Sequence, residues 1–481
     1  KLTLDLNGFT LNGGTEKGKP ALTVTAKVTV KDSSTDRAGT IKREDTAVNS
    51  GNGSHYVIDI QGDGWLTFES GKVTNGSGNA DRSRGASLVR VGDDSVAKYP
   101  GLNIKGGTFT QDNFIVIKVD RGDLFLNGGT LTSANSYVIE NWHRTTIKGG
   151  TANGAVAAWT YSDGANSSLK ISGGTINGDV TAVNYGNAEG KTAKVEISGG
   201  RVNGNLDTCS YDPKTGDLAS ITDAEKAAIA VSGGTFNQAV DGKYCADGFT
   251  PLQNTDGTYG VEQQVLAKIG DTEYYTMDAA FHAVKAGETI VLQRDYTTSS
   301  VQNSGNDSFT IDLNNHTWAY TGSDVESAAF EINCANATLT VKNGTVVSAS
   351  MLGLIPSASS MKGTITYDNA GLVFEKVEAT ANGHSGIETN GNNTDDVVTL
   401  KDSTLNVPNG YGIYFASSGK VTIENSIITA KTMGVQVCSG NLEISGDKSK
   451  IEVTGDAVAK TENDGAIEDG AAVSVVNRPG Y

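Results

Sequence analysis

Short stretches of alternating apolar and polar residues run through the whole chain. Clear examples are LTVTAKVTV at 22–30 and LTVKNGTVV at 339–347. A period of two is typical of β-strands that bury one face, because successive side chains point to opposite sides of the sheet. The alternation predicts a protein built almost entirely from short strands.

A Gly-Gly pair, usually followed by threonine, recurs six times in the first half of the chain. Counted from the second glycine, the steps are 22, 21, 24, 26 and 34 residues. Periods of roughly 20–50 residues indicate repeat architectures, in which each unit covers the apolar face of its neighbour. A coil of this length holds three short strands, and successive coils stack about 4.8 Å apart in parallel register. The second glycines of the pairs are Gly107, Gly129, Gly150, Gly174, Gly200 and Gly234.

The two halves of the chain resemble each other. The opening LTLDLNGFTL at 2–11 matches FTIDLNNHTW at 309–318. We therefore expect two homologous modules, at 1–262 and 263–481. The first module lacks the entry segment at 273–296 that opens the second, so we expect the chain to be a piece of a longer multidomain protein.

That entry segment contains the one convincing helical pattern. Met277, Ala280 and Val284 fall on one face at helical spacing, and Gly287 stands where a C-terminal cap is expected. The pattern predicts a helix near 276–286. A short helix with one apolar face can cover the open end of a strand stack, which would otherwise pair with another chain.

The charge of the chain restricts its partners. The 481 residues carry a formal net charge of −17. Phosphate recognition needs clustered Lys and Arg, so nucleic acid and anionic membrane surfaces are not expected partners. No run of about 18 apolar residues occurs, and we therefore expect no membrane insertion.

Four cysteines show no spacing typical of a metal site. Cys209 could pair with Cys245, and Cys334 with Cys438, but buried free thiols are the simpler interpretation. Phosphate-binding loops, zinc-protease motifs and nucleophile elbows are also missing, so we expect no cofactor.

Several phrases point to a known family. The opening LDLNG, the strands ending in SGG(T/R), and the segments GIYFASSGKVTI at 412–423 and VTIENSIIT at 421–429 resemble bacterial right-handed parallel β-helix proteins of the pectin-lyase-like kind. The resemblance is strongest to the large repetitive surface proteins of Gram-positive anaerobes. It implies an all-β fold of two tandem right-handed parallel β-helices, the second with an N-terminal capping helix. This group includes polysaccharide lyases, glycoside hydrolases and non-catalytic adhesins, so the fold alone does not choose a function.

One sheet face of the first module is predicted to carry a row of aromatic rings. Eleven residues beyond successive second glycines stand Lys118, Glu140, Tyr161, Tyr185 and Tyr211. Exposed rings would stack on the sugars of an extended glycan. Alternatively, the rings point into the core or lie under the loops at 186–195 and 212–230, and only stabilise the stack. The candidate ligand-binding residues are Glu140, Trp142, Trp159, Tyr161, Tyr185 and Tyr211, with Tyr414 in the second module.

The second module holds the candidate catalytic residues. Aligning Gly353, Gly386, Gly412 and Gly434 places Ile355, Glu388, Tyr414 and Gln436 in one column. The nearby NTDD at 393–396 resembles part of the polygalacturonase signature, but the histidine lies upstream and no RIK follows. Two carboxylates near a histidine suit general acid–base chemistry on a glycosidic bond, whereas a solvated loop is the simpler interpretation. The catalytic candidates are Glu388, Asp395, Asp396 and His384.

Paired aspartates leave room for one metal interaction. Asp93–Asp94 and Asp395–Asp396 could hold a loosely bound surface calcium, although ordinary turn residues explain both pairs more simply.

The resemblance to these surface proteins implies an extracellular protein of a bacterial cell surface. We expect an adhesin or stalk whose partner is a glycan or another host surface molecule. The alternative is a glycoside hydrolase or polysaccharide lyase that degrades polysaccharide or host glycan.

Overall fold

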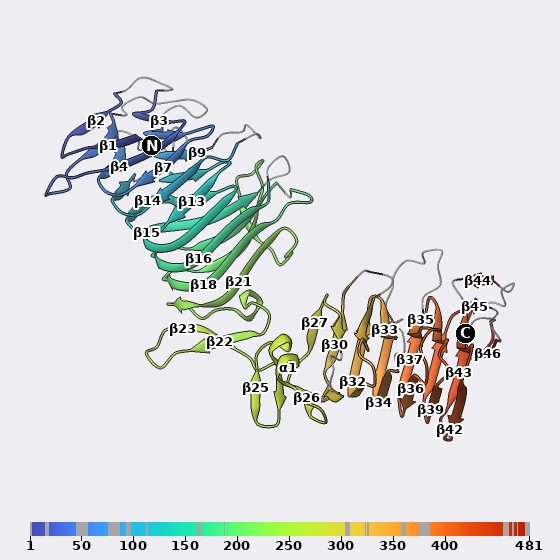
Figure 1. The fold of residues 1–481 in the computed structure, drawn as a ribbon. Coiled ribbons are helices and arrows are strands. Elements are labelled where there is room, and N and C mark those ends of the chain that lie inside the picture. Colours follow the sequence, from blue (N-terminus) through green and yellow to red (C-terminus); the bar gives the residue numbers. More distant parts are fainter. Residues whose placement is uncertain are drawn as a thin grey trace. The chain divides into compact units, whose positions relative to one another are not determined.

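The structure, a computed structural model, is nearly all β, with long parallel sheets (Figure 1). The chain divides into two compact units, Lys1–Gln264 and Val265–Tyr481. The residues described are 2–14, 19–44, 56–75, 87–92, 98–111, 114–160, 165–186, 188–303, 308–322, 324, 327–356, 362–374, 385–455, 461–463, 466–468 and 470–476.

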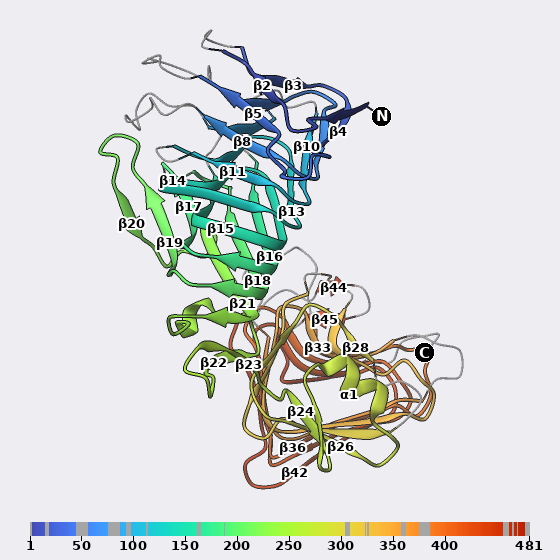
Figure 2. The same ribbon diagram turned by 90° about the vertical axis from the view of Figure 1, so that its left-hand side faces the viewer.

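Strands of the first unit pair in parallel in three ladders (Figures 1 and 2). The first ladder contains β1 (Leu2–Asp5), β4 (Lys27–Lys31), β7 (Trp65–Phe68), β10 (Gly101–Ile104), β13 (Asp123–Leu126), β15 (Arg144–Thr160), β16 (Ser167–Ile176), β18 (Ala193–Val202) and β21 (Ala227–Phe236). The second contains β2 (Thr10–Asn12), β5 (Thr40–Arg43), β8 (Lys72–Asn75), β11 (Thr108–Thr110), β14 (Thr130–Asn141) and the later parts of β15, β16, β18 and β21. The third contains β3 (Leu22–Val24), β6 (Ile58–Ile60), β9 (Val89–Val91), β12 (Ile117–Val119), the ends of β14 and β15, β17 (Val180–Tyr185) and β19 (Leu206–Tyr211).

The first unit also has antiparallel pairs. Strand β20 (Leu218–Ser220) adds to β19, and β22 (Phe249–Gln253) forms a hairpin with β23 (Tyr259–Gln263). A short 3₁₀ turn, η1 (Gly242–Tyr244), precedes this hairpin.

The second unit repeats the three-ladder plan. Its first ladder contains β26 (Thr289–Leu292), β29 (Phe309–Asp312), β32 (Thr338–Ser348), β34 (Thr364–Phe374), β36 (Val397–Lys401), β39 (Lys420–Glu424) and β42 (Asn441–Ser445). The second contains β27 (Tyr296–Thr298), β30 (Thr317–Tyr320), the later parts of β32 and β34, β37 (Thr404–Val407), β40 (Ile427–Ala430) and β43 (Lys450–Val453). The third contains β28 (Gln302–Asn303), β31 (Ala328–Glu331), β33 (Met351–Ile355), β35 (Ser385–Thr389), β38 (Tyr411–Phe415), β41 (Met433–Val437) and β46 (Val473–Val475). Antiparallel pairs are β24 (Ala267–Ile269) with both β25 (Thr272–Tyr274) and β26, and β44 (Thr461–Asn463) with β45 (Ala466–Glu468).

These long parallel ladders are consistent with a β-solenoid, as the repeat spacing predicts. Side chains that stack inward along each ladder form the core. Leu66, Leu102 and Leu124, for example, lie in register on successive strands and are fully or almost fully buried. The alternating pattern of the sequence is therefore the pattern of inward and outward positions.

The Gly-Gly pairs stack directly on one another. A Cβ placed on the first glycine of a pair would lie 2.3 Å from a backbone oxygen of the previous coil at Gly128 and Gly173, and 2.5 Å at Gly149. The second glycines adopt positive φ, for example 79° at Gly174. The first position thus needs glycine for space and the second for conformation, because other residues rarely adopt that φ.

The predicted helix is present but shorter than expected. Helix α1 (Met277–Ala283) begins after Thr276, whose side chain accepts a hydrogen bond from the Ala279 N–H, and ends with Val284 as its C-cap. Gly287 is not the cap. It stands in the following turn at φ 82°, where the Glu288 N–H bonds to the Lys285 carbonyl. Met277 and Ala280 are buried in the core of the second unit, where α1 contacts β24 and β25.

The matching Asp-Leu-Asn motifs form the same local turn in both units. Asp5 accepts a hydrogen bond from the Asn7 N–H at 3.1 Å, and Asp312 accepts one from the Asn314 N–H at 2.9 Å. Both asparagines have positive φ, of 42° and 50°. Asparagine tolerates this left-handed conformation better than most residues, which explains its place at both strand ends.

The four cysteines, Cys209, Cys245, Cys334 and Cys438, are free thiols. Among the described residues, no helix has the length and apolar character needed to cross a membrane.

Candidate functional site

Four of the predicted aromatic residues, Trp142, Trp159, Tyr185 and Tyr211, gather on the outer face of the third ladder of the first unit, together with Tyr137, which was not predicted. Tyr137, Trp142, Trp159, Tyr185 and Tyr211 form an aromatic cluster that is separate from the core. Trp159 lies at its centre and is only 6% exposed. Its ring stacks on Trp142 at a centroid distance of 5.6 Å and meets Tyr211 edge-on at 5.4 Å. The rings therefore cover one another, and Trp159 offers little surface for a ligand to stack on.

The register of this ladder differs from the one counted from the glycine pairs. Glu140 pairs with Ala157, not with Tyr161, and the register between β14 and β15 shifts between Thr132 and Ile139. Additional residues at 133–136 lengthen this coil before its third strand. Farther along, Trp159 aligns with Val183, and Tyr185 with Tyr211, as expected. Tyr161 lies outside the described residues.

Glu140 is held inside a network of side chains. Its carboxylate accepts a hydrogen bond from the Trp142 indole at 2.8 Å, and Lys118 lies beside it in register. Lys118 in turn pairs with Asp120 at 2.9 Å. Burial raises the pKa of Glu140. Its surroundings therefore stabilise the ring cluster and leave little of this carboxylate exposed to a ligand.

The predicted column of the second unit is present with one correction. Glu388, Tyr414 and Gln436 lie in register, but their neighbour on β33 is Leu354, and Ile355 points into the core. Tyr414 is 5% exposed. Glu388 accepts a hydrogen bond from the Ser385 hydroxyl at 2.7 Å.

The two predicted catalytic aspartates diverge. Asp396 is fully buried, and its Oδ1 accepts a hydrogen bond from the Gly363 N–H at 2.8 Å. Its Oδ2 is buried without a hydrogen-bond partner, and burial raises the pKa of this carboxyl. Asp395 is exposed and has φ 59°. Together they do not form an open pair of carboxylates, and His384 lies outside the described residues.

A groove that sequence analysis missed lies beside the aromatic cluster, where the third ladder begins. It has a volume of about 740 Å³. Tyr137 of β14 and Leu218 of β20 are among the residues that line it, and Leu218 is 49% exposed. The full lining is Ser133, Ala134, Asn135, Ser136, Tyr137, Gly154, Ala155, Asn177, Gly178, Asp179, Thr181, Gly204, Asn205, Asp207, Cys209, Leu218 and Ser220.

A second glycine column forms the floor of the groove. Gly154, Gly178 and Gly204 each come four residues after a Gly-Gly pair. A Cβ on Gly178 would lie 2.3 Å from the backbone of Gly154, and one on Gly204 equally close to Gly178. Close coil contact therefore excludes side chains here and leaves a hollow. The repeated Asn-Gly pairs at 153–154, 177–178 and 203–204 were the sequence signal for it.

Two carboxylates lie in this groove. Asp207 is half-buried and held by several donors: the Ser220 hydroxyl at 2.9 Å, the Cys209 thiol at 3.1 Å and the Tyr244 hydroxyl at 3.3 Å. Asp179 is exposed and accepts a hydrogen bond from the Asn205 N–H at 2.7 Å. Burial, together with Asp207, raises the pKa of the Cys209 thiol to about 12, so this cysteine stays protonated.

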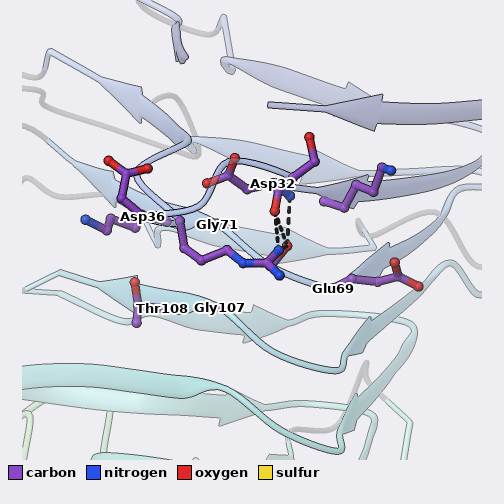
Figure 3. A pocket seen from close by; sticks show the side chains of 11 residues that line it. Asp32, Asp36, Glu69, Gly71, Gly107 and Thr108 are labelled. Atoms are coloured by element: carbon purple, nitrogen blue, oxygen red, sulfur yellow. Dashed lines mark hydrogen bonds between the residues drawn. The ribbon is translucent and has the colours of Figure 1, made fainter. Parts of the chain in front are cut away.

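A second hollow, of about 820 Å³, lies among the early coils of the first unit (Figure 3). Asp32 contributes to its lining but faces backbone donors. The carboxylate accepts hydrogen bonds from the N–H groups of Gly8 at 2.8 Å and Gly39 at 2.7 Å. Burial raises the pKa of Asp32, but the hydrogen bonds outweigh it and hold the pKa below its ordinary value. Another lining acid, Glu69, pairs with Lys105 at 3.5 Å. The Asp32 carboxylate holds a turn together, and Glu69 is paired with the next coil, so we favour the glycine-floored groove as the candidate site.

No group of three or more His, Cys, Asp or Glu residues in the described parts of the chain is placed to hold a metal ion. Asp93 and Asp94, named above for calcium, lie outside the described residues. No protein-family model matches this chain, and a search of curated proteins finds no similar sequence.

Proposed function

We propose that this chain is an extracellular protein of a bacterial cell surface, an adhesin or stalk that binds glycan in the glycine-floored groove. Its fold would be two tandem right-handed parallel β-helices of the pectin-lyase-like kind. The partner would be a glycan of the host or of another surface, and the chain would be part of a longer multidomain protein.

The observation that carries the proposal is the combination of side chains in the groove. Tyr137 and Leu218 supply apolar surface for sugar faces, while Asn177, Asn205 and Asp179 offer exposed polar groups for hydroxyls. Ligand sites typically combine apolar walls with a few placed polar groups. From β14 to β20 the groove crosses four strand spacings, roughly 19 Å at about 4.8 Å each. That length suits an oligosaccharide better than a small metabolite.

A steric block tests the site. Ala134 lines the groove and is exposed, whereas Ala219 is exposed on β20 but is not part of the lining. Ala134→Trp should weaken glycan retention on an array at least about tenfold, a loss of about 1.4 kcal/mol, and Ala219→Trp should leave it unchanged. Both variants should melt like the parent chain. If the parent chain retains no glycan, or both variants retain it equally, the proposed function or its site is wrong.

A specific feature favours a second candidate, a glycoside hydrolase. Asp207 pairs in register with Thr181, two residues beyond Asp179. With strands about 4.8 Å apart and a rise of about 3.3 Å per residue, the Cα atoms of the two aspartates lie roughly 8 Å apart. Carboxyl groups some 5–10 Å apart are typical of glycosidases. Release of reducing sugar from a polysaccharide by the parent chain, lost in Asp207→Asn, would favour this candidate over the adhesin.

A further inference from the structure

The charges around the groove are of one sign. Among the described residues that line it, Asp179 and Asp207 are the only charged ones, and none of them is Lys, Arg or His. Among the nearby cations, Lys170 and Lys194 bind Glu196 on the first ladder. Lys243 pairs with Asp241 at 3.8 Å in a separate hollow that Asp207 also lines. The chain as a whole also has a formal net charge of −17.

The two carboxylates differ in how they are held. Asp207 is fixed by the Ser220, Cys209 and Tyr244 side chains, and the Thr208 N–H adds a fourth donor at 2.8 Å. These donors are neutral, so they orient the carboxylate without cancelling its charge. The Asp179 hydrogen bonds, from the Asn205 N–H at 2.7 Å and the Asn205 amide at 3.3 Å, both go to Oδ1. Its Oδ2 accepts no hydrogen bond from the described residues and lies on the exposed side chain.

We propose that the groove selects glycans that carry free amino groups, such as oligomers of β-linked glucosamine. The inference rests on the proposed function and names the class of sugar. A protonated amine can bond to the Asp179 carboxylate, with Asp207 beside it as the second negative charge. A uronic acid or a sialic acid would instead place a carboxylate against Asp179 and Asp207, where the described lining offers no Lys, Arg or His to balance it, which is unfavourable. Acidic polysaccharides of the pectate type should therefore bind more weakly than amino sugars.

The expected selectivity follows from the exposure of the two acids. Solvent-exposed ion pairs contribute modestly, roughly a twofold to fivefold gain in affinity for each carboxylate. The full preference for an amino sugar over its N-acetylated counterpart should then reach about tenfold. Because Asp179 is exposed and Asp207 is only half-buried, raising the salt from about 0.01 M to about 0.15 M should shrink the preference, since the screening length falls from about 30 Å to about 8 Å.

The experiment compares three tetrasaccharides by calorimetric titration of the whole chain: glucosamine, N-acetylglucosamine and galacturonate oligomers. The amino oligomer should bind tightest, the neutral one about tenfold more weakly, and the acidic one weakest. Asp179→Asn should lower the preference for the amino oligomer over the neutral one twofold to fivefold. Asp217→Asn removes the same charge from an exposed loop outside the groove and is the matched control.

The outcomes separate the two proposals. Equal binding of the amino and neutral oligomers, or a preference for galacturonate, overturns the amino-sugar inference while the glycan-binding function stands. Binding of none of the three overturns the amino-sugar inference, and a glycan array without retained ligands then overturns the function as well. An equal loss of preference in Asp179→Asn and Asp217→Asn overturns the assignment to this groove, because it attributes the effect to overall charge.

Discussion

Replacing Gly173 by alanine tests the stacking of the glycine pairs. Gly173 is the first glycine of its pair and does not have a positive φ, so alanine meets no conformational strain there. Its new Cβ would lie 2.3 Å from the Lys148 carbonyl oxygen and 2.9 Å from the Lys148 carbonyl carbon. Both atoms belong to the backbone of the previous coil. They can move only if the two coils separate locally.

The cost of that separation can be worked from the structure. Overpacking in a tightly packed interior costs about 1–3 kcal/mol, and each ladder hydrogen bond weakened nearby adds about 1 kcal/mol. Gly173 pairs with Lys148, and its neighbour Ser172 pairs with Gly199, so hydrogen bonds on both sides are affected. We expect a loss of about 3 kcal/mol. For a unit of this size that corresponds to a melting temperature lower by about 6–12 °C.

Thermal unfolding followed by tryptophan fluorescence is the appropriate assay. The chain has four tryptophans, and Trp65, Trp142 and Trp159 belong to the first unit, so the signal reports mainly on that unit. Gly242 is the matched control, because a Cβ there meets nothing within 4 Å and its φ is not positive. Gly242→Ala should be neutral or slightly stabilising. Equal melting temperatures for Gly173→Ala and the parent chain would refute the close coil contact.

Three further predictions concern the buried polar and aromatic groups. Burial raises the pKa of Asp396 above its ordinary 3.8, so the protonated carboxyl favours the folded state at low pH and stability falls as pH rises through the folded-state pKa. Asp396→Asn should remove this fall in stability. Denaturant midpoints that change equally with pH in the variant and the parent chain would contradict the prediction. Trp159→Ala should lower the free energy of unfolding by about 3 kcal/mol because the ring is buried among other rings, whereas an unchanged midpoint would mean that the rings are separately solvated. If the parent chain releases reducing sugar, Glu388→Gln and Asp395→Asn should release it equally, since these carboxylates line none of the hollows in the first unit. Loss of activity in either variant would place catalysis in the second unit.

Much of the fold could be predicted because the signals were periodic. Strand alternation and glycine spacing repeat from coil to coil, and each glycine pair marks a place where two backbones meet. The helix also had a local signature, although Gly287 suggested too late an end because a turn, not a cap, required its positive φ.

The candidate site was harder to predict. Counting eleven residues from each glycine pair assumed equal coils, and the additional residues at 133–136 shifted Glu140 onto Ala157. The groove was missed because its floor consists of glycines, whose only signal was a second repeated pair with asparagine.

By itself the sequence determined the period of the strands, the stacking of the coils and the acidic character of the chain, because each depends on residue order or composition alone. Only the tertiary structure decided that Trp159 is covered by its neighbours and that Asp396 turns inward while Asp395 faces solvent. It also brought Asp179 and Asp207 together across one coil step. The exposure of a side chain and its distance from another depend on which residues of the next coil lie beside it. The lengths of the loops between strands set that alignment.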